Sequence, residues 1–325
     1  MPGIKKMENR RNFIKKAGGI AISTGLFGTT LASCSDLMKE KNALALAPET
    51  PEGLFFQISL AQWSLHKTFW FGKLDNLDFA ATARNKFGIG AVEYVNQFFS
   101  DKAEDTAYLA DMKRRAADND VKNLIIMIDN EGSLAILNEA ARKKAIENHY
   151  KWIDAANFLG CHSIRVNAAG KGNRESVAEA AIDSLGTLCE YGEKEGINII
   201  VENHGGYSSD PTWLVDVIQK VGKKNCGILP DFGNFYISLW PYRKYDRYDG
   251  MKQLMPFAKG VSAKSHDFNR EGKDKSTDFK RVLQIVRDSG FTGHIGIEYE
   301  GYKLSEEAGI KASKQLLIQS GLSLV

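Results

Sequence analysis

Residues 177–231 decide the fold, and they read VAEAAIDSLGTLCEYGEKEGINIIVENHGGYSSDPTWLVDVIQKVGKKNCGILPD. Apolar residues return at intervals of three and four over Val177–Glu195, which predicts an amphipathic helix. Gly196 follows this helix, and the apolar run Ile197–Val201 comes next with the length of a buried strand. Helix, glycine and strand in this order are typical of the repeating unit of a parallel sheet.

The same order recurs along the chain after residue 53. Runs of strand length return roughly every 30 to 40 residues, which is the spacing of one strand, one helix and two loops. The eight runs are Phe56–Leu60, Ala91–Val95, Leu124–Ile128, Ser163–Val166, Ile197–Val201, Gly227–Leu229, Gly260–Ala263 and Ile295–Ile297. Between them the clearest helices are predicted over Ala135–Phe158, Val177–Glu195 and Thr212–Val221, the last one preceded by the capping pair Asp210-Pro211.

Eight strand and helix units predict an α/β fold, a (β/α)₈ TIM barrel that forms a single domain over residues 54–325. A doubly wound open sheet is the alternative. That alternative is less favoured because no G-x-G-x-x-G motif follows the first strand.

The first 34 residues read as a signal peptide. Residues 10–15, RRNFIK, match the twin-arginine pattern, and the apolar run Ala17–Ala32 that follows is shorter than the roughly 20 residues that span a bilayer. The run ends in Leu31-Ala32-Ser33-Cys34, which resembles a lipobox. A chance cysteine near an ordinary cleavage site is the alternative.

The lipobox resemblance implies a lipid anchor at Cys34 and a polar tether over residues 35–53. We therefore expect a protein exported by the twin-arginine route, a periplasmic or cell-envelope lipoprotein that contacts the membrane only through its anchor. The 43 Lys and Arg residues nearly balance the 40 Asp and Glu residues, and no basic stretch is interleaved with aromatic residues. The composition therefore argues against nucleic acid as a partner.

Three acidic residues directly follow apolar runs. They are Glu202, Asp231 and Glu298, and in a barrel the strand ends face a common mouth. Each alone is typical of a helix N-cap or a salt bridge. Three carboxylates at one mouth repel one another unless a cation or a shared proton compensates. We therefore expect one divalent metal ion, with Mn²⁺ first and Mg²⁺, Co²⁺ or Zn²⁺ as alternatives.

Glu after strand five, Asp-x-x-[His/Asn] after strand six and Glu after strand eight resemble the xylose isomerase-like barrels, which include sugar phosphate isomerases/epimerases and are related to endonuclease IV. The resemblance covers Phe56 to the C-terminus. It implies that Glu202, Asp231 and Glu298 bind the metal, with Glu202 and Glu298 as the catalytic acid/base pair.

The seventh strand departs from that family's pattern. Where the family commonly has His-x-Lys-Asp, this chain reads Ser262-Ala263-Lys264-Ser265-His266-Asp267, so Ser262 stands at the usual ligand position. His266 shares parity with Ser262 and Lys264, and we expect it to serve as the fourth metal ligand. The alternative is a loop histidine that binds nothing. Asn234 stands where the endonucleases have a further metal-binding His, which argues against DNA repair.

Other polar and aromatic residues near the predicted mouth are candidates for substrate binding, through hydrogen bonds to sugar hydroxyls or contact with a sugar ring. They could equally pair with neighbours or pack in the core. They are Trp63, His66, Glu93, Arg165, Asn167, His204 and Lys264.

A metal with two carboxylates suits proton abstraction beside a carbonyl. The leading hypothesis is a carbohydrate isomerase or epimerase with a small-molecule sugar as its partner. An eliminative lyase acting on 3-keto-glycosides uses the same enolate chemistry and is the first alternative. A non-catalytic sugar-binding lipoprotein is the second, and a homo-oligomer is compatible with each.

Overall fold

The computed structural model describes residues 51–325. The predicted signal peptide, Cys34 and most of the tether lie outside the described residues, so those expectations stay predictions. Among residues 51–325, no helix combines the length and the apolar character needed to cross a bilayer.

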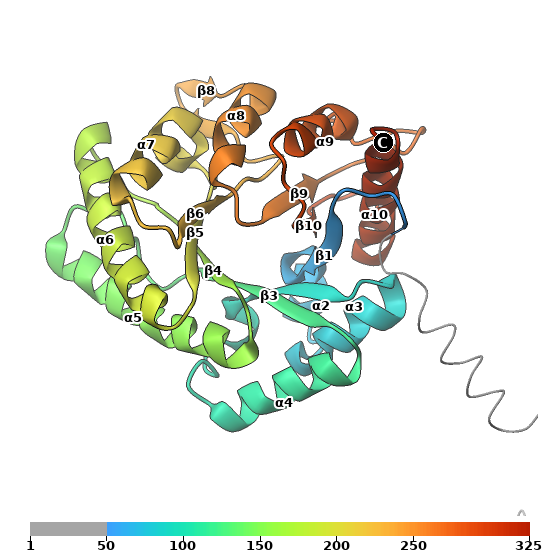
Figure 1. Cartoon of the computed structure of the whole chain (residues 1–325), viewed down its shortest axis with the longest axis horizontal. Coiled ribbons are helices and arrows are strands. Elements are labelled where there is room, and N and C mark those ends of the chain that lie inside the picture. Colours follow the sequence, from blue (N-terminus) through green and yellow to red (C-terminus); the bar gives the residue numbers. More distant parts are fainter. Residues whose placement is uncertain (1–50) are drawn as a thin grey trace, which may run out of the picture. The chain divides into compact units, whose positions relative to one another are not determined.

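The described chain is a (β/α)₈ barrel, which confirms the predicted fold (Figure 1). Its parallel strands run in the order β6-β5-β4-β3-β2-β1-β10-β9. Between β6 and β9 the ring is completed by the parallel bridges Ile228↔Ala258 and Asp231↔Ser262. The strands are β1 (Gln57–Ala61), β2 (Ala91–Val95), β3 (Lys122–Met127), β4 (Ser163–Val166), β5 (Asn198–Glu202), β6 (Cys226–Leu229), β9 (Val261–Ser265) and β10 (His294–Tyr299).

Helices surround the strands on the outside. They are α2 (His66–Trp70), α3 (Phe79–Phe87), α4 (Thr106–Asp118), α5 (Glu139–Leu159), α6 (Arg174–Lys194), α7 (Pro211–Val221), α8 (Arg247–Leu254), α9 (Phe279–Asp288) and α10 (Glu306–Leu322). At α7 the Asp210 carboxylate accepts a hydrogen bond from the Thr212 N–H, which confirms the predicted cap. Helix α5 begins at Glu139 rather than Ala135, because Asn138 caps it.

A small antiparallel hairpin follows β6, with strands β7 (Tyr236–Leu239) and β8 (Tyr242–Lys244). The sequence pattern did not predict it, because its residues are half-buried or exposed and show no burial alternation.

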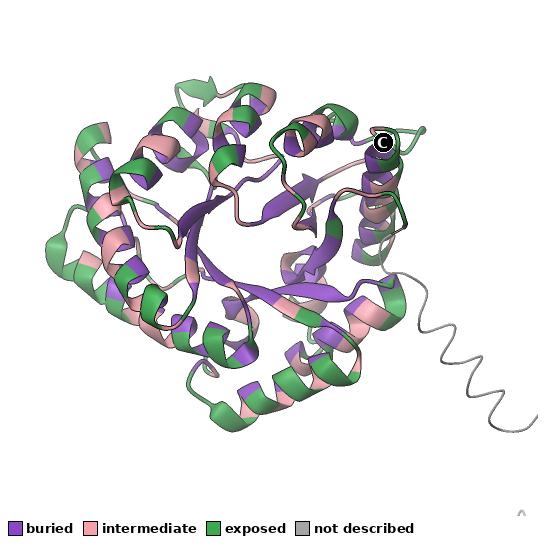
Figure 2. Ribbon diagram, in the orientation of Figure 1, coloured by how far each residue is buried: buried purple, intermediate pink, exposed green. Residues whose placement is uncertain are grey.

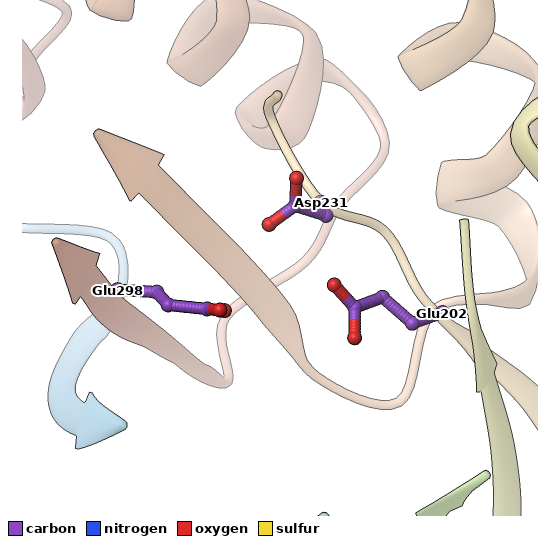
Figure 3. A group of neighbouring side chains, drawn as sticks. All are labelled: Glu202, Asp231 and Glu298. Carbon is purple, nitrogen blue, oxygen red and sulfur yellow. The ribbon is translucent and has the colours of Figure 1, made fainter. Parts of the chain in front are cut away.

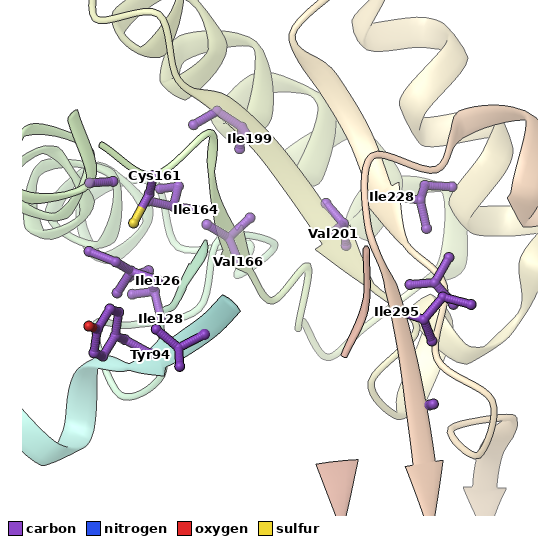
Figure 4. Close-up of a cluster of buried hydrophobic side chains, with 14 of the residues drawn as sticks. Tyr94, Ile126, Ile128, Cys161, Ile164, Val166, Ile199, Val201, Ile228 and Ile295 are labelled. Atoms are coloured by element: carbon purple, nitrogen blue, oxygen red, sulfur yellow. The ribbon is translucent and has the colours of Figure 1, made fainter. Parts of the chain in front are cut away.

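Strand residues alternate between two layers. The outward positions, such as Ile199 and Val201 of β5, pack against the helices in a continuous apolar layer (Figure 4). Figure 2 shows the strands buried, while the helices are buried on one side and exposed on the other. The inward positions at the carboxyl ends are polar, among them Arg165 of β4, Glu202 of β5 and Glu298 of β10. The two-residue period therefore sends these charged side chains into the barrel.

Candidate active site

Three buried carboxylates meet inside the carboxyl end of the barrel. Glu202 ends β5, Asp231 follows β6, and Glu298 lies within β10. Each offers an oxygen within 4.8 Å of the others. Figure 3 shows the three side chains pointing into a common space. The structure thus brings together the residues that the strand ends had indicated.

Two buried cations partly compensate this negative charge. The Lys264 ammonium lies 3.1 Å from Glu298 Oε1 and donates to Glu300 Oε1 at 3.2 Å. Lys264 and Glu298 are register partners in β9 and β10, so strand pairing itself sets this contact. On the other side, Arg165 Nε lies 3.1 Å from Glu202 Oε2, and its Nη1 donates to Asp129 Oδ1 at 2.8 Å.

Ser262 lies between two of the carboxylates. Its hydroxyl oxygen is 2.6 Å from Asp231 Oδ2 and 2.9 Å from Glu298 Oε2. A hydroxyl carries one proton and donates to one carboxylate at a time. Both short contacts are therefore favourable only if a second proton or a cation neutralises the group. The register bridge between Asp231 and Ser262 explains their closeness.

The amide of Asn234 completes the surroundings of the carboxylates. Its Nδ2 donates to Glu202 Oε1 at 2.9 Å. The backbone N–H groups of Gly233 and Asn234 both donate to Asp231 Oδ1 at 2.8 Å, which fixes the Asp231 carboxylate at the start of the loop. In the sequence Asn234 served only to argue against a multi-metal site, and the structure gives it this hydrogen-bonding position.

The protonation of the three carboxylates is uneven. Burial raises the pKa of Glu202 and of Asp231, because an ionised carboxylate loses its hydration, and this outweighs the opposing charge of Arg165 at Glu202 and of Lys264 at Asp231. The neighbouring carboxylates raise both pKa values further. Burial also acts on Glu298, but Lys264 and Arg165, together with hydrogen bonds from Lys264 and Ser262, outweigh it and lower the pKa of Glu298. Near neutral pH the site therefore places a readily protonated Glu202 opposite an ionised Glu298.

Glu93 of β2 is a further buried carboxyl on the barrel interior. Ser59 Oγ donates to its Oε1 at 2.6 Å, while its Oε2 has no hydrogen-bond partner. The carboxyl lies against Gly296 of β10, where a Cβ would come within 2.6 Å of Glu93 Oε1, so the absence of a side chain there makes room for Glu93. Burial first, opposed by the Ser59 hydrogen bond, raises the pKa of Glu93 to about 7.

A cavity of about 590 Å³ opens beside the carboxylates. Its walls contain Trp63, Arg165, Asn167, His204 and Glu298, all of which the sequence analysis had singled out. Asn167 Nδ2 donates to Asp129 Oδ1 at 2.7 Å. The His204 residue is exposed at the surface, yet loss of hydration among its neighbours, and then the charges of Arg165 and Lys264, lower its pKa. His204 is therefore a neutral wall residue near pH 7.

The two remaining histidine candidates do not join the carboxylates. His66 stacks on Trp63 with ring centroids 5.0 Å apart, and its Nδ1 lies 2.7 Å from the Trp63 carbonyl oxygen, so it supports the Trp63 side chain. His266 lies in the loop after β9, with a half-exposed side chain whose Nε2 is 4.0 Å from Glu300 Oε2. Strand β9 ends at Ser265, and the clustered carboxylates do not include His266 in their group, so its expected role as a metal ligand stays a prediction without structural support.

Asp129 is a site residue that the sequence analysis missed. It directly follows the apolar run Leu124–Ile128, which is the same signal that identified the three clustered carboxylates. Its backbone N–H donates to Asn96 Oδ1 at 2.9 Å, and its carboxylate holds Arg165 and Asn167. Its position directly after a strand would have been enough to identify it.

Solved structures share this architecture at low sequence identity. A xylose isomerase-like TIM barrel protein from Mycobacterium smegmatis in complex with magnesium is 16% identical, with a TM-score of 0.62 over 83% of this chain and 98% of that one. The 3-keto-D-glucoside 4-epimerase from E. coli is 13% identical, with a TM-score of 0.59 over 81% of this chain and 98% of that one. These similarities show the shared fold.

Sequence comparison gives the family. A mouse protein named "Putative hydroxypyruvate isomerase" is 26% identical over an alignment of 159 residues, with 44% of this chain and 56% of that protein covered. The chain spans about half of the length of the curated relatives that it matches. The sequence profile described as "Xylose isomerase-like TIM barrel" matches residues 80–320, and the barrel and its strand-end carboxylates agree with that match. The chain belongs to the xylose isomerase-like TIM barrel family.

Proposed function

We propose that this protein is a metal-dependent carbohydrate isomerase or epimerase that moves a proton beside a carbonyl. One observation carries the proposal: Glu202, Asp231 and Glu298 converge within 4.8 Å beside a cavity large enough for a sugar. Family membership and the names of the similar isomerase and epimerase support it.

The chemistry of the donor set fits one divalent ion. Glu202, Asp231 and Glu298 would hold it, since three carboxylate oxygens are the ligands that Mg²⁺ and Mn²⁺ prefer, and we place Mn²⁺ first. The short contacts of Ser262 to two carboxylates also call for added positive charge. When bound, such an ion would polarise the substrate carbonyl and its neighbouring hydroxyl.

The protein's own side chains supply the proton transfer. Glu298, with its lowered pKa, is the group that is ionised and ready to accept the proton. Burial raises the pKa of Glu202, so of the two glutamates it is the one that more readily carries the proton between its removal and its return. Lys264 and Arg165 lie beside the two glutamates and stabilise the negative charge that develops when the C–H proton leaves.

The test uses Glu202→Gln and Glu298→Gln, which keep the size of each side chain but remove its carboxylate. The purified chain is incubated with free, phosphorylated and 3-keto sugars in D₂O, and the products are followed by mass. We expect deuterium beside the carbonyl with the wild type and a loss of about 10²- to 10⁴-fold in each folded variant. Near-full activity of Glu202→Gln would show that the assigned proton transfer is wrong.

An eliminative lyase on 3-keto-glycosides is the second candidate. The similarity to a structure named as a 3-keto-D-glucoside 4-epimerase favours keeping it. Removal of the same proton leads to elimination when a leaving group stands β to the enolate. A lyase therefore releases an alcohol or aglycone, whereas the product of an epimerase keeps all its substituents. Sugar binding without any deuterium exchange would instead assign a non-catalytic binding protein.

We also propose that the protein is exported and anchored by lipid at Cys34. This rests on residues 10–15 and on Leu31-Ala32-Ser33-Cys34. Both motifs lie outside the described residues.

A further inference from the structure

We propose that the cavity selects uncharged sugars over phosphorylated ones, and that Asp129 and Glu300 are the residues that set this selectivity. The inference rests on the proposed function and names its substrate class. It comes from the carboxylates that surround the two buried cations of the site, Arg165 and Lys264.

Each cation is held between a deep carboxylate and a shallower one. Arg165 lies between Glu202, whose side chain is 1% exposed, and Asp129, whose side chain is 18% exposed. Lys264 repeats this arrangement between Glu298, which is 7% exposed, and Glu300, which is 28% exposed. The more exposed member of each pair, Asp129 or Glu300, also lines the cavity.

A phosphate group needs cations or free N–H donors directed at it. Of the residues that line this cavity, Arg165 alone is a Lys or Arg, and its guanidinium is already paired with Asp129 and Glu202, although its buried Nε makes no hydrogen bond. A phosphate, which carries a charge of about −1.5 to −2, would meet Asp129 and Glu300 on entering. A divalent ion among the clustered carboxylates would not remove this repulsion, because Asp129 and Glu300 lie outside the cluster.

The rest of the wall suits hydroxyl groups. Gln97, Asn130, Ser133 and Asn167 offer uncharged donors and acceptors, and Asn167 Oδ1 is buried without a hydrogen-bond partner. An unpaired buried acceptor gains most from a donor such as a sugar hydroxyl and nothing from an ionised phosphate oxygen. Trp63 adds an aromatic surface for the apolar side of an uncharged ring.

The test measures binding in Asp129→Asn and Glu300→Gln, which keep size and hydrogen-bond acceptors but remove one charge each. Glu271→Gln is the matched control, because Glu271 is exposed and pairs with Lys273 away from this cavity. Calorimetric titrations use D-fructose with D-fructose 6-phosphate, D-glucose with D-glucose 6-phosphate, and inorganic phosphate. They are run with chelator and again with Mg²⁺.

We expect the wild type to bind the free sugar of at least one pair about tenfold more tightly than its phosphate. Each site variant should narrow that ratio by about tenfold, mainly through tighter binding of the phosphate, while Glu271→Gln leaves it unchanged. A merely structural role for Asp129 and Glu300 predicts weaker binding of both ligands instead. Gain of phosphate binding therefore separates the two explanations.

The inference would be overturned if, in every pair whose free sugar binds, the phosphate bound as tightly as the free sugar, or if the ratios were unchanged in both site variants. A wild type that binds neither free sugar would also overturn it. Its failure is distinguishable from failure of the proposed function. If the protein binds free sugar selectively but shows no deuterium exchange, the proposed enzymatic activity is wrong and the proposed selectivity stands. Deuterium exchange on a sugar phosphate that binds more tightly than the free sugar would support the enzyme and overturn the selectivity.

Discussion

The free energy of unfolding of the wild-type protein is expected to fall as the pH rises from about 4.5 to about 7, because Glu93 loses its proton. The variant Glu93→Gln should not show this fall. Glu93 is buried, and its pKa rises from 4.5 in the unfolded reference to about 7 in the folded chain. The folded state therefore binds the proton more tightly, so the stabilisation is fully present below pH 4.5 and is lost as the pH rises through 7. A difference of 2.5 pKa units corresponds to about 3 kcal/mol.

The assay is urea unfolding at pH 5, 7 and 8.5 in the presence of chelator, for the wild type, Glu93→Gln and the exposed control Glu104→Gln. The wild type and the control should lose about 2.5 kcal/mol more than Glu93→Gln across this range, since a part of the difference is already lost at pH 5. Glutamine still accepts the hydrogen bond from Ser59, so that contact does not distinguish the variants. Parallel profiles of unfolding free energy for all three proteins would refute the reasoning, since they would show that Glu93 titrates alike in both states.

Three further predictions concern other parts of the chain. Burial, then Lys122 and His162, lower the pKa of His294 to about 4. The free energy of unfolding should therefore fall by about 1–2 kcal/mol as the pH drops from about 6.5 to 4. In acid unfolding curves, His294→Gln should show a smaller fall. Elemental analysis should find about one divalent ion per chain, and chelation should lower the melting temperature until Mn²⁺ is restored, with about 2.7 kcal/mol gained at a hundredfold excess over Kd; unchanged melting on adding Mn²⁺ would count against the site. Cys34→Ser should yield exported protein without lipid, and equal membrane attachment of mutant and wild type in fractionation would contradict the anchor.

The fold could be predicted because buried strands and helices require apolar residues at regular intervals along the sequence. Strands β2 and β4 were predicted with their observed bounds, although Glu93 lies within the first and Arg165 within the second. Strand β10 was predicted too short, as Ile295–Ile297, because Glu298 was taken to end the strand. In the structure β10 runs on to Tyr299, since Glu298 pairs in register with Lys264 and still hydrogen-bonds within the sheet. A charged residue that directly follows an apolar run is therefore ambiguous, because it can end the strand or lie within it.

Part of the candidate site could also be predicted. Strand-end position was enough to bring Glu202, Asp231 and Glu298 together, because parallel strands deliver their ends to one mouth. The ion pairs were beyond reach, because they depend on cross-strand register and on side-chain direction. His266 shows a related limit, since its expected place depended on a strand that extends to residue 266, whereas β9 ends at Ser265.

Part of the interior of this barrel is unlike a usual hydrophobic core, and this difference follows from the site. Other inner strand positions, among them Ile125, Met127 and Ile200, keep a buried apolar cluster. Barrel interiors are ordinarily filled by layers of branched apolar side chains. Here the inner positions of neighbouring strands carry Ser59, Glu93, Ser262, Lys264 and Glu298, and each is buried.

Buried charges stabilise a fold weakly even when they are paired. The stability of this chain must therefore come from the apolar layer between strands and helices, which contains most of the buried hydrophobic residues. The small side chains at Ser59, Ser262 and Gly296 leave the space in which the long acidic side chains lie. Enlarging any of them would press on the carboxylates before it disturbed the outer layer, so the interior can change its chemistry while the barrel itself persists.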